Sequence, residues 1–274
     1  VIMGHEASGV IEECGKNVAN FKKGDRVTFD STIYCGKCHF CRQGLINLCD
    51  NRKVLGVSCD EYRLNGAFAE YVSIPQHILY PLPETVSFEQ AAMVEPLSIA
   101  LHTVSRGPVS LNCSAVVVGT GMIGLLVIQL LKAAGCGKII AIDLVQEKLE
   151  MAKKFGADFI IKAGEPCISD KIIKLTKNRG ADIAFEVVGT DSALQTAVSS
   201  VRKGGVVVLV GNLSPSVNFP LQSVVTRQIS LYGSCASAGE YPDCLSMIAD
   251  GRVDVDSFIS AVAPLSEGAV WFKR

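Results

Sequence analysis

The segment SAVVVGTGMIGLLVIQLLKAAG, residues 114–135, decides the fold of this chain. A run of β-branched residues ends at Gly119, and an apolar stretch of helical length begins after Gly121. Together with Gly124, these glycines form the pattern G-x-G-x-x-G. The pattern has little specificity alone, but between a strand and a helix it is typical of a turn that binds the pyrophosphate of a dinucleotide. The segment therefore predicts a strand, a dinucleotide-binding turn and a helix.

The next predicted strand, KIIAID at 138–143, ends in Asp143. In a dinucleotide site, an acidic residue at this point accepts hydrogen bonds from the adenosine ribose and repels the 2′-phosphate of NADP. Lys148 follows little more than one helical turn later and can flank the same ribose. The alternative role for Asp143 is an N-cap of the helix predicted over 146–157. With the glycines in place, the pattern favours NAD binding.

The region after Leu97 repeats short apolar strands separated by stretches of helical length. The further strands are predicted in FII (159–161), ADIAFEVVG (181–189), GGVVVLVG (204–211) and ISLYGS (229–234). Strands that alternate with helices in this way predict an α/β fold with a doubly wound parallel sheet. The carboxyl ends of the last strands, at 187–189, 210–212 and 234–236, are expected to line the cofactor crevice. The candidate residues there are Val210, Gly211, Asn212, Ser234, Cys235 and Ala236.

Residues 1–96 follow a different pattern. SGVIEECG, GDRVTF and FAEYVSIP read as strands, and KKGD and PLPETV read as turns, which predicts a small antiparallel β domain. The segment SFEQAAMVEPLSIALHTVSR, after Pro83, has a helical pattern. We expect this helix to break near Glu95 and Pro96, because proline disfavours helical geometry in the residue before it.

The segment CGKCHFCRQGLINLC carries four cysteines, Cys35, Cys38, Cys41 and Cys49, spaced C-x2-C-x2-C-x7-C. The chain has 11 cysteines, an odd number, and no sign of secretion, so a disulfide framework is a poor explanation. The short spacings let one loop direct thiolates at a single point, and four such ligands predict a closed, structural zinc site. The alternative is four ordinary buried or free thiols. The polar residues between the cysteines argue against this alternative, because they are not typical of a buried apolar strand.

Composition narrows the function classes. The chain has 274 residues, 49% of them hydrophobic, and a formal net charge of -1. This charge provides no basic field for nucleic acid or anionic membranes, so neither is an expected partner. The longest apolar run, MIGLLVIQLL from Met122, is too short to cross a bilayer, and the first residues lack the pattern of a secretory signal. We expect a cytoplasmic protein.

Several motifs together resemble the zinc-dependent medium-chain alcohol dehydrogenase family over essentially the whole chain. They are GHEASGVI, the cysteine quartet, GAFAEYV, the Glu95-Pro96 pair, and GTGMIG with Asp143. Glu6 after His5, glutamate at position 95, and the short loop from Cys49 to Gly66 are similar to the polyol branch of sorbitol and iditol dehydrogenases. Threonine and sugar-phosphate dehydrogenases are related alternatives.

The resemblance implies a division of the chain and a reaction. Residues 1–96 correspond to an incomplete GroES-like catalytic domain with a structural zinc lobe at 35–49, 97–236 to a Rossmann NAD-binding domain, and 237–274 to a segment that returns to the catalytic domain. The implied reaction is the zinc-dependent oxidation of a secondary alcohol to a ketone, with hydride transfer to NAD. A homo-oligomer, either a dimer or a tetramer, is also expected.

The family pattern makes His5 a ligand of a catalytic zinc, with Glu6 and Glu95 either ligating the metal or holding its water. Ile123 matches residues that pack against the nicotinamide. The family also carries a zinc-binding cysteine and a hydroxyl residue ahead of the position of His5, and a last strand after the position of Arg274. This sequence begins at Val1 and ends at Arg274, so we expect it to be a fragment without these parts.

Two functions from other classes remain as alternatives. A zinc-ribbon module that binds nucleic acid explains the cysteines but not the dinucleotide pattern or the charge. A non-catalytic NAD-binding redox sensor explains the glycines and one structural zinc, yet does not need His5, Glu6 and Glu95 together. Metal content distinguishes the enzyme from the sensor, because the enzyme requires two zinc ions per chain and the sensor requires one.

Overall fold

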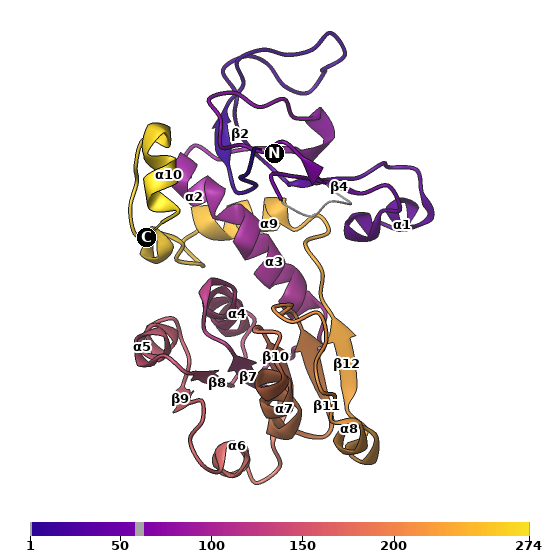
Figure 1. Cartoon of the computed structure of the whole chain (residues 1–274), viewed down its shortest axis with the longest axis vertical. Coiled ribbons are helices and arrows are strands. Elements are labelled where there is room, and N and C mark those ends of the chain that lie inside the picture. The colour runs from indigo at the N-terminus through magenta and orange to yellow at the C-terminus, as the bar shows by residue number, and fades with distance from the viewer. Residues whose placement is uncertain (1, 58–62, 274) are drawn as a thin grey trace. The chain divides into compact units, whose positions relative to one another are not determined.

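The structure is a computed structural model that describes residues 2–57 and 63–273 (Figure 1). The chain divides into two compact units. One consists of Val1–Ser98 with Ser237–Arg274, and the other of Ile99–Ala236. Helix α3 (Val94–Ser105) carries the chain from the first unit into the second.

The unit at 99–236 is built on a six-stranded parallel sheet in the order β12-β11-β10-β7-β8-β9. Its strands are β7 (Ser114–Val118), β8 (Lys138–Asp143), β9 (Phe159–Lys162), β10 (Ala181–Glu186), β11 (Val201–Leu209) and β12 (Ser230–Gly233). From β7, the sheet extends through β8 and β9 on one side and through β10, β11 and β12 on the other. This is the topology of a doubly wound dinucleotide-binding sheet. This confirms the fold predicted from the glycine segment.

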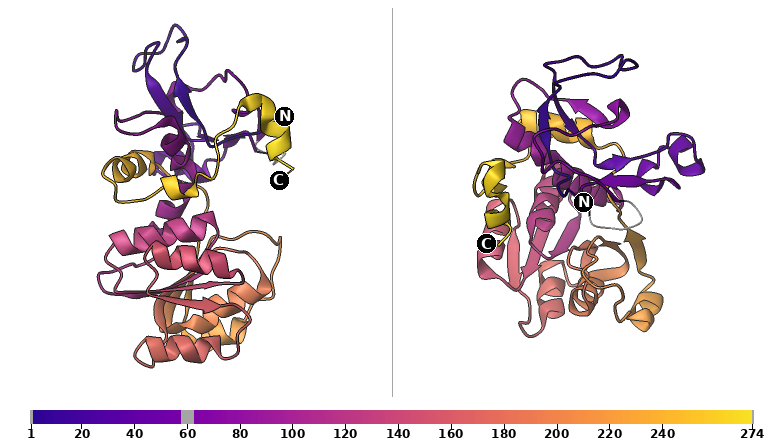
Figure 2. Two further views of the ribbon diagram at one scale, coloured as in Figure 1. Left: turned by 90° about the vertical axis from the view of Figure 1, so that its left-hand side faces the viewer. Right: turned by 45° about the horizontal axis from the view of Figure 1, so that its top comes forward.

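Helices cover both faces of this sheet (Figure 2, left). They are α4 (Met122–Ala133), α5 (Gln146–Lys154), α6 (Ile168–Leu175), α7 (Asp191–Ser200) and α8 (Leu221–Arg227). Helices α4 and α5 contact β7, β8 and β9, whereas α7 contacts β7, β10 and β11 and also packs against α6. Both faces are therefore buried, which explains why these strands are apolar without alternation.

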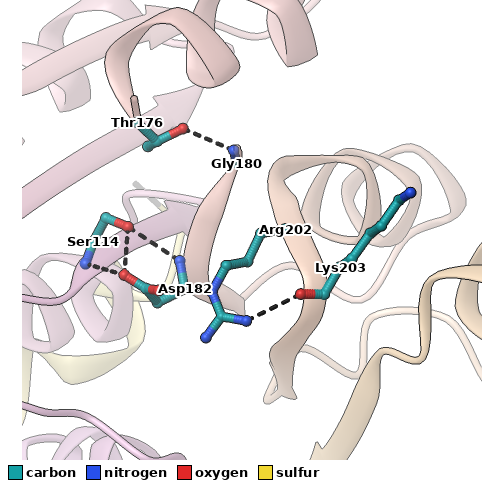
Figure 3. Close-up of polar contacts among 6 residues, drawn as sticks. All are labelled: Ser114, Thr176, Gly180, Asp182, Arg202 and Lys203. Atoms are coloured by element: carbon teal, nitrogen blue, oxygen red, sulfur yellow. Dashed lines mark hydrogen bonds and ion pairs between the residues drawn. The ribbon is translucent and has the colours of Figure 1, made fainter. Parts of the chain in front are cut away.

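The amino ends of three neighbouring strands are joined by a polar cluster around Asp182 (Figure 3). The backbone N–H and the hydroxyl of Ser114 both donate to Asp182 Oδ2, at 2.8 and 2.7 Å. Arg202 Nε donates to Asp182 Oδ1 at 2.8 Å. Burial alone would raise the pKa of Asp182, but these bonds and the guanidinium charge outweigh it and lower the pKa. The cluster ties β7, β10 and β11 together at the edge opposite their carboxyl ends.

The first unit contains two small three-stranded sheets, ordered β1-β2-β6 and β3-β4-β5. Their strands are β1 (Ser8–Val10), β2 (Arg26–Phe29), β3 (Thr32–Ile33), β4 (Lys53–Leu55), β5 (Arg63–Leu64) and β6 (Leu79–Pro81). All pairs are antiparallel except β4 with β5, which is parallel. The prediction of a small antiparallel β domain is confirmed, apart from this one pair.

Two local predictions for this unit are wrong. FAEYVSIP forms no strand: Phe68 N–H donates to Met3 O at 2.9 Å, but among the described residues the segment pairs with no strand, and Tyr71 is 75% exposed. The helical segment breaks at Met93, between α2 (Phe88–Ala92) and α3, and not at Glu95. Pro96 lies in the first turn of α3, where its missing N–H leaves no hydrogen bond unmade.

The segment 237–274 packs against the first part of the chain. It contains α9 (Tyr241–Ala249) and α10 (Gly268–Trp271), and the lobe at 35–49 contains α1 (His39–Arg42). Gln90 Nε2 donates to both carboxylate oxygens of Asp256, at 3.1 and 3.0 Å. The rings of Phe68 and Phe272 meet edge to face at 5.3 Å. These contacts hold the returning segment to the β domain.

None of the helices formed by residues 2–57 and 63–273 combines the length and apolar character needed to cross a membrane.

Candidate metal and cofactor sites

The glycine turn is shaped by backbone packing that excludes side chains. Gly119 has φ +96°, in the left-handed region. A Cβ on Gly124 would lie 1.9 Å from Gly119 O, so α4 can approach the turn only with glycine there. A Cβ on Gly121, by contrast, would meet no atom within 4 Å. The open side of the turn therefore lies at Gly121, the N-cap of α4, where the helix presents free N–H groups to an anion.

Asp143 lies beside this turn because β7 and β8 are in register, with Val118 opposite Ile142. Its Oδ2 accepts a hydrogen bond from Thr120 N–H at 2.7 Å, and its Oδ1 accepts one from Val145 N–H at 2.9 Å. Burial acts to raise the pKa of Asp143, but these two bonds and the charge of Lys148 lower it further than burial raises it. The carboxylate is thus ionised at neutral pH, and it both braces the turn and presents negative charge.

The other predicted cofactor residues lie along the same edge of the sheet. Leu209 is opposite Glu186 on one side and Gly233 on the other, so the residues after these strands are neighbours. A Cβ on Gly211 would lie 2.1 Å from Gly189 N, which shows backbone packed against backbone. The structure brings together two groups of predicted residues in this unit: Gly119, Gly121, Ile123, Gly124, Asp143 and Lys148 around α4 and β8, and Val210, Gly211, Asn212, Ser234, Cys235 and Ala236 after β11 and β12. Their contact with a cofactor stays a prediction.

The four cysteines of the lobe form one cluster. The Sγ atoms of Cys35, Cys38, Cys41 and Cys49 all lie within 4.8 Å of one another. Backbone N–H groups point at the sulfurs: Cys35 N–H and Asn51 N–H donate to Cys49 Sγ at 3.2 and 3.3 Å. A tetrahedral zinc with Zn–S bonds of about 2.3 Å holds its sulfurs about 3.8 Å apart. The cluster fits such an ion.

The acid–base properties of this cluster also fit a cation. The Lys37 N–H lowers the pKa of the Cys35 thiol to about 6, whereas burial and the neighbouring thiols raise the pKa of Cys41 to about 12. Without a cation, the four sulfurs cannot all carry negative charge at this separation. A divalent ion removes the repulsion and allows all four to bind as thiolates.

A second cluster joins His5, Glu6 and Glu95, whose ligand atoms also lie within 4.8 Å of one another. His5 Nε2 is 3.9 Å from Glu95 Oε1. The His5 side chain is 36% exposed and that of Glu95 is 14% exposed, so the cluster opens to solvent on the side of His5. One imidazole and two carboxylates are ligands that zinc accepts in catalytic sites.

The backbone before His5 is fixed by three glycines. Gly4 has φ +99°, and its N–H donates to Gly56 O at 3.1 Å. A Cβ on Gly56 or on Gly66 would lie 1.9 or 2.1 Å from Gly4 O. Gly56 follows β4 and Gly66 follows β5, so the second small sheet sets the position of His5.

Burial, and then the negative charges of Glu6 and Asp30, raise the pKa of Glu95 to about 8. Glu95 lies in the first turn of α3, among residues that are buried. A largely buried carboxylate beside a second, exposed carboxylate is balanced by a cation. The residues of this second cluster therefore also fit a metal ion, although its ligand set stays a prediction.

Sequence reasoning missed two buried groups next to this cluster. Asp30 directly follows β2 and is 3% exposed, and Tyr241 begins α9 and is fully buried. Both stand in the same unit as Glu95. The only sequence signal concerned Asp30, which is an acidic residue directly after the predicted strand RVTF.

A cavity of about 360 Å³, lined by Tyr80, Pro242 and Leu245 among others, contains none of the predicted site residues.

Comparisons with known proteins agree with this architecture. The alcohol dehydrogenase GroES-like domain matches residues 1–84, and the zinc-binding dehydrogenase domain matches residues 123–250. The sorbitol dehydrogenase of Bacillus subtilis (strain 168) is 35% identical over 262 residues, which cover 94% of this chain and 72% of that protein.

Two solved structures show the same fold. Alcohol dehydrogenase TADH from Thermus sp. ATN1 has a TM-score of 0.92 and 32% identity, and the match covers 99% of this chain and 81% of that one. An alcohol dehydrogenase (rspB) from E. coli CFT073, complexed with NADH, has a TM-score of 0.90 and 28% identity, with 99% and 79% covered. The resemblance inferred from the motifs is confirmed. The chain belongs to the zinc-binding dehydrogenases, as a member of the polyol branch of the medium-chain alcohol dehydrogenase family.

Proposed function

We propose that the chain oxidises a polyol or sugar alcohol at a secondary hydroxyl, yielding the ketone, NADH and a proton. The family assignment makes it an oxidoreductase that uses zinc and NAD. The observation that carries the polyol assignment is the cluster of His5, Glu6 and Glu95, together with the likeness to sorbitol dehydrogenase. In this proposal, the unit that contains the cluster is the catalytic domain and the unit at 99–236 binds NAD.

The residues of the second unit have two tasks in this reaction. The N–H groups at the start of α4 bind the pyrophosphate, and Gly121 leaves space for it. Asp143 accepts hydrogen bonds from the adenosine ribose through the lone pairs that Thr120 and Val145 leave free. Its charge would repel a 2′-phosphate, so the proposal specifies NAD rather than NADP.

The residues of the first unit hold metal ions in this proposal. The four cysteines bind a structural zinc, which stabilises the lobe at 35–49. His5, with Glu6 and Glu95, binds a catalytic zinc, which supplies a Lewis acid for the alcohol oxygen when it is bound. A cation at this position would favour the ionised form of Glu95, whose pKa burial raises to about 8.

Two measurements test this proposal. The first is NAD reduction by the complete gene product with a panel of polyols, L-threonine and sugar phosphates, for which we expect the highest kcat/KM with a polyol. The second is the NAD to NADP ratio of kcat/KM in Asp143→Asn, which removes the charge and keeps a hydrogen-bond acceptor. We expect this variant to lose much of the preference for NAD. A preference for NADP in the unaltered protein, or activity with none of the alcohols, would refute the proposal.

We also propose a cytoplasmic location and a homo-oligomeric state. The free cysteines support a cytoplasmic location, because thiolate zinc ligands persist where glutathione keeps cysteines reduced. Strand β12 supports the second, since it ends the parallel sheet and, among the described strands, pairs only with β11. An edge of this kind is able to pair with a second copy. Size-exclusion chromatography with light scattering tests the oligomeric state.

A further inference from the structure

The carboxyl group of Glu186 is buried without a cation beside it. Glu186 is the last residue of β10, and only 2% of its surface is exposed. Among the described residues, no cationic side chain pairs with it, and burial raises its pKa further than its hydrogen bonds lower it. Burial of such a group is unfavourable unless hydrogen bonds replace the lost hydration. Its hydrogen bonds are therefore the feature that needs an explanation.

One oxygen of this carboxyl group accepts hydrogen bonds from two backbone N–H groups of the turn that follows β10. Glu186 Oε1 accepts from Val188 N–H at 2.9 Å and from Gly189 N–H at 2.7 Å. The residue before them still belongs to the ladder of the sheet, since Val187 N–H donates to Val118 O at 2.9 Å. The side chain of Glu186 thus binds the chain directly after the point where the hydrogen bonds of the sheet end.

This turn packs against both groups of predicted cofactor residues. On one side, a methyl group of Val188 covers the glycine turn, since a Cβ on Gly119 would lie 2.5 Å from Val188 Cγ2. On the other side, a Cβ on Gly211 would lie 2.1 Å from Gly189 N and 2.4 Å from Val188 N. The two residues that Glu186 binds therefore lie between the glycine turn and the loop after β11.

Backbone hydrogen bonds attach the loop after β11 to the same place. Val210 N–H and Gly211 N–H both donate to Glu186 O, at 2.9 and 3.1 Å. Ser214 N–H donates to Gly189 O at 3.1 Å. These bonds join the loop to the turn, whereas the side-chain bonds of Glu186 fix the turn to the end of its own strand.

We propose that Glu186 is a positioning residue for NAD, because its side chain fixes Val188 and Gly189 between the glycine turn and the loop after β11 before the cofactor binds. The side chain acts through the backbone that it holds, so the role requires an acceptor at the right reach and not a charge. A site whose loops are already ordered avoids the free-energy cost of ordering them on binding. The role in NAD binding rests on the proposed function, whereas the brace between Glu186 and the turn does not.

Two substitutions separate the reach of this side chain from its charge. Glu186→Gln removes the charge and keeps an acceptor oxygen at the same reach, whereas Glu186→Asp keeps the charge and shortens the side chain by one CH₂ group. NAD affinity is measured by calorimetric titration of the complete gene product. We expect the NAD dissociation constant to stay within about threefold of the unaltered value in Glu186→Gln and to rise about tenfold in Glu186→Asp. The opposite order would show that charge matters and would refute the proposal.

Asp182→Ala is the matched control for a loss of stability. Asp182 lies near the opposite end of β10 and also accepts a backbone N–H, that of Ser114 (Figure 3). We expect this variant to unfold at a lower urea concentration and to bind NAD as the unaltered protein does. If it weakens NAD binding as much as Glu186→Asp does, lost stability explains the effect and the positioning role is refuted.

A second measurement does not depend on the cofactor. Without NAD, the amide hydrogens of Val188 and Gly189 should exchange slowly in the unaltered protein and in Glu186→Gln, and should lose protection in Glu186→Asp. Equal exchange in all three proteins refutes the brace. Fast exchange or weak NAD binding in Glu186→Gln refutes the proposal whether or not Glu186→Asp folds. If the unaltered protein binds no NAD, the proposed function fails and the role in binding fails with it, while the exchange rates still decide the brace.

Discussion

The glycine turn permits a paired experiment in which binding and stability respond differently. In Gly124→Ala, the added methyl lies 1.9 Å from Gly119 O and 2.9 Å from its carbonyl carbon, so backbone must move on one side. In Gly121→Ala, the methyl meets no atom within 4 Å, and φ of -68° suits alanine. Only the first change conflicts with the packing of the folded chain.

The expected magnitudes follow from these contacts. A rigid overpacked contact costs about 3 kcal/mol, and the better helix propensity of alanine returns about 1, so Gly124→Ala should lose about 2 kcal/mol. Loss of glycine at an N-cap costs Gly121→Ala less than about 1 kcal/mol. In the proposed binding mode, however, NAD brings its pyrophosphate to the backbone at Gly121, where the methyl would stand. We expect NAD binding to weaken at least about tenfold, or about 1.4 kcal/mol, in this variant.

The assay is urea unfolding of each variant without cofactor, followed by calorimetric titration with NAD. The reasoning requires Gly121→Ala to keep nearly all its stability and lose affinity, and Gly124→Ala to lose stability. If Gly121→Ala binds NAD as the unaltered protein does, the pyrophosphate does not lie at this turn. If Gly124→Ala is fully stable, the close approach of α4 is not a constraint.

Three further outcomes are expected. Cys38→Ser should lose one zinc per chain and unfold at a lower temperature, as measured by metal analysis and calorimetry, because a closed tetrahedron loses a thiolate; full zinc content would contradict this. Gly66→Ala should lose metal at the cluster that includes His5, since its methyl would lie 2.1 Å from Gly4 O, whereas Gly15→Ala, with nothing within 4 Å, should retain it. Asp182→Asn should cost no more than about 1 kcal/mol at pH 7, because solvent screens this partly exposed ion pair. The lowered pKa of Asp182 supplies stability that is present above the ordinary pKa and is lost as pH falls through the folded value. Urea unfolding should show the gap to the unaltered protein closing below about pH 4, and a gap independent of pH would contradict the reasoning.

Sequence patterns predicted the parallel sheet well because both the periodicity and the glycine turn are local signals. The strands of that unit are continuous apolar runs, and Gly119 and Gly124 mark the turn that joins strand to helix. The β domain was harder to predict. Its strands are short, and the parallel pairing of β4 with β5 is decided by contacts between distant backbone segments.

The metal clusters show the same contrast. The cysteine quartet could be predicted because its ligands lie within one short segment. His5 and Glu95 are far apart in sequence, so only the resemblance to a family suggested that they meet. Tyr241 gave no signal, since a tyrosine at a helix start is usually a packing residue, and its unpaired hydroxyl exists only in the folded chain.

The polar cluster around Asp182 has a consequence for how this protein can change over evolutionary time. It joins the amino ends of β7, β10 and β11, whereas the predicted cofactor residues follow the carboxyl ends of the same strands. Substitutions at two such separated places have nearly additive effects on stability. Loops at the carboxyl edge are therefore free to diverge toward new cofactors or alcohols while the opposite edge retains the fold.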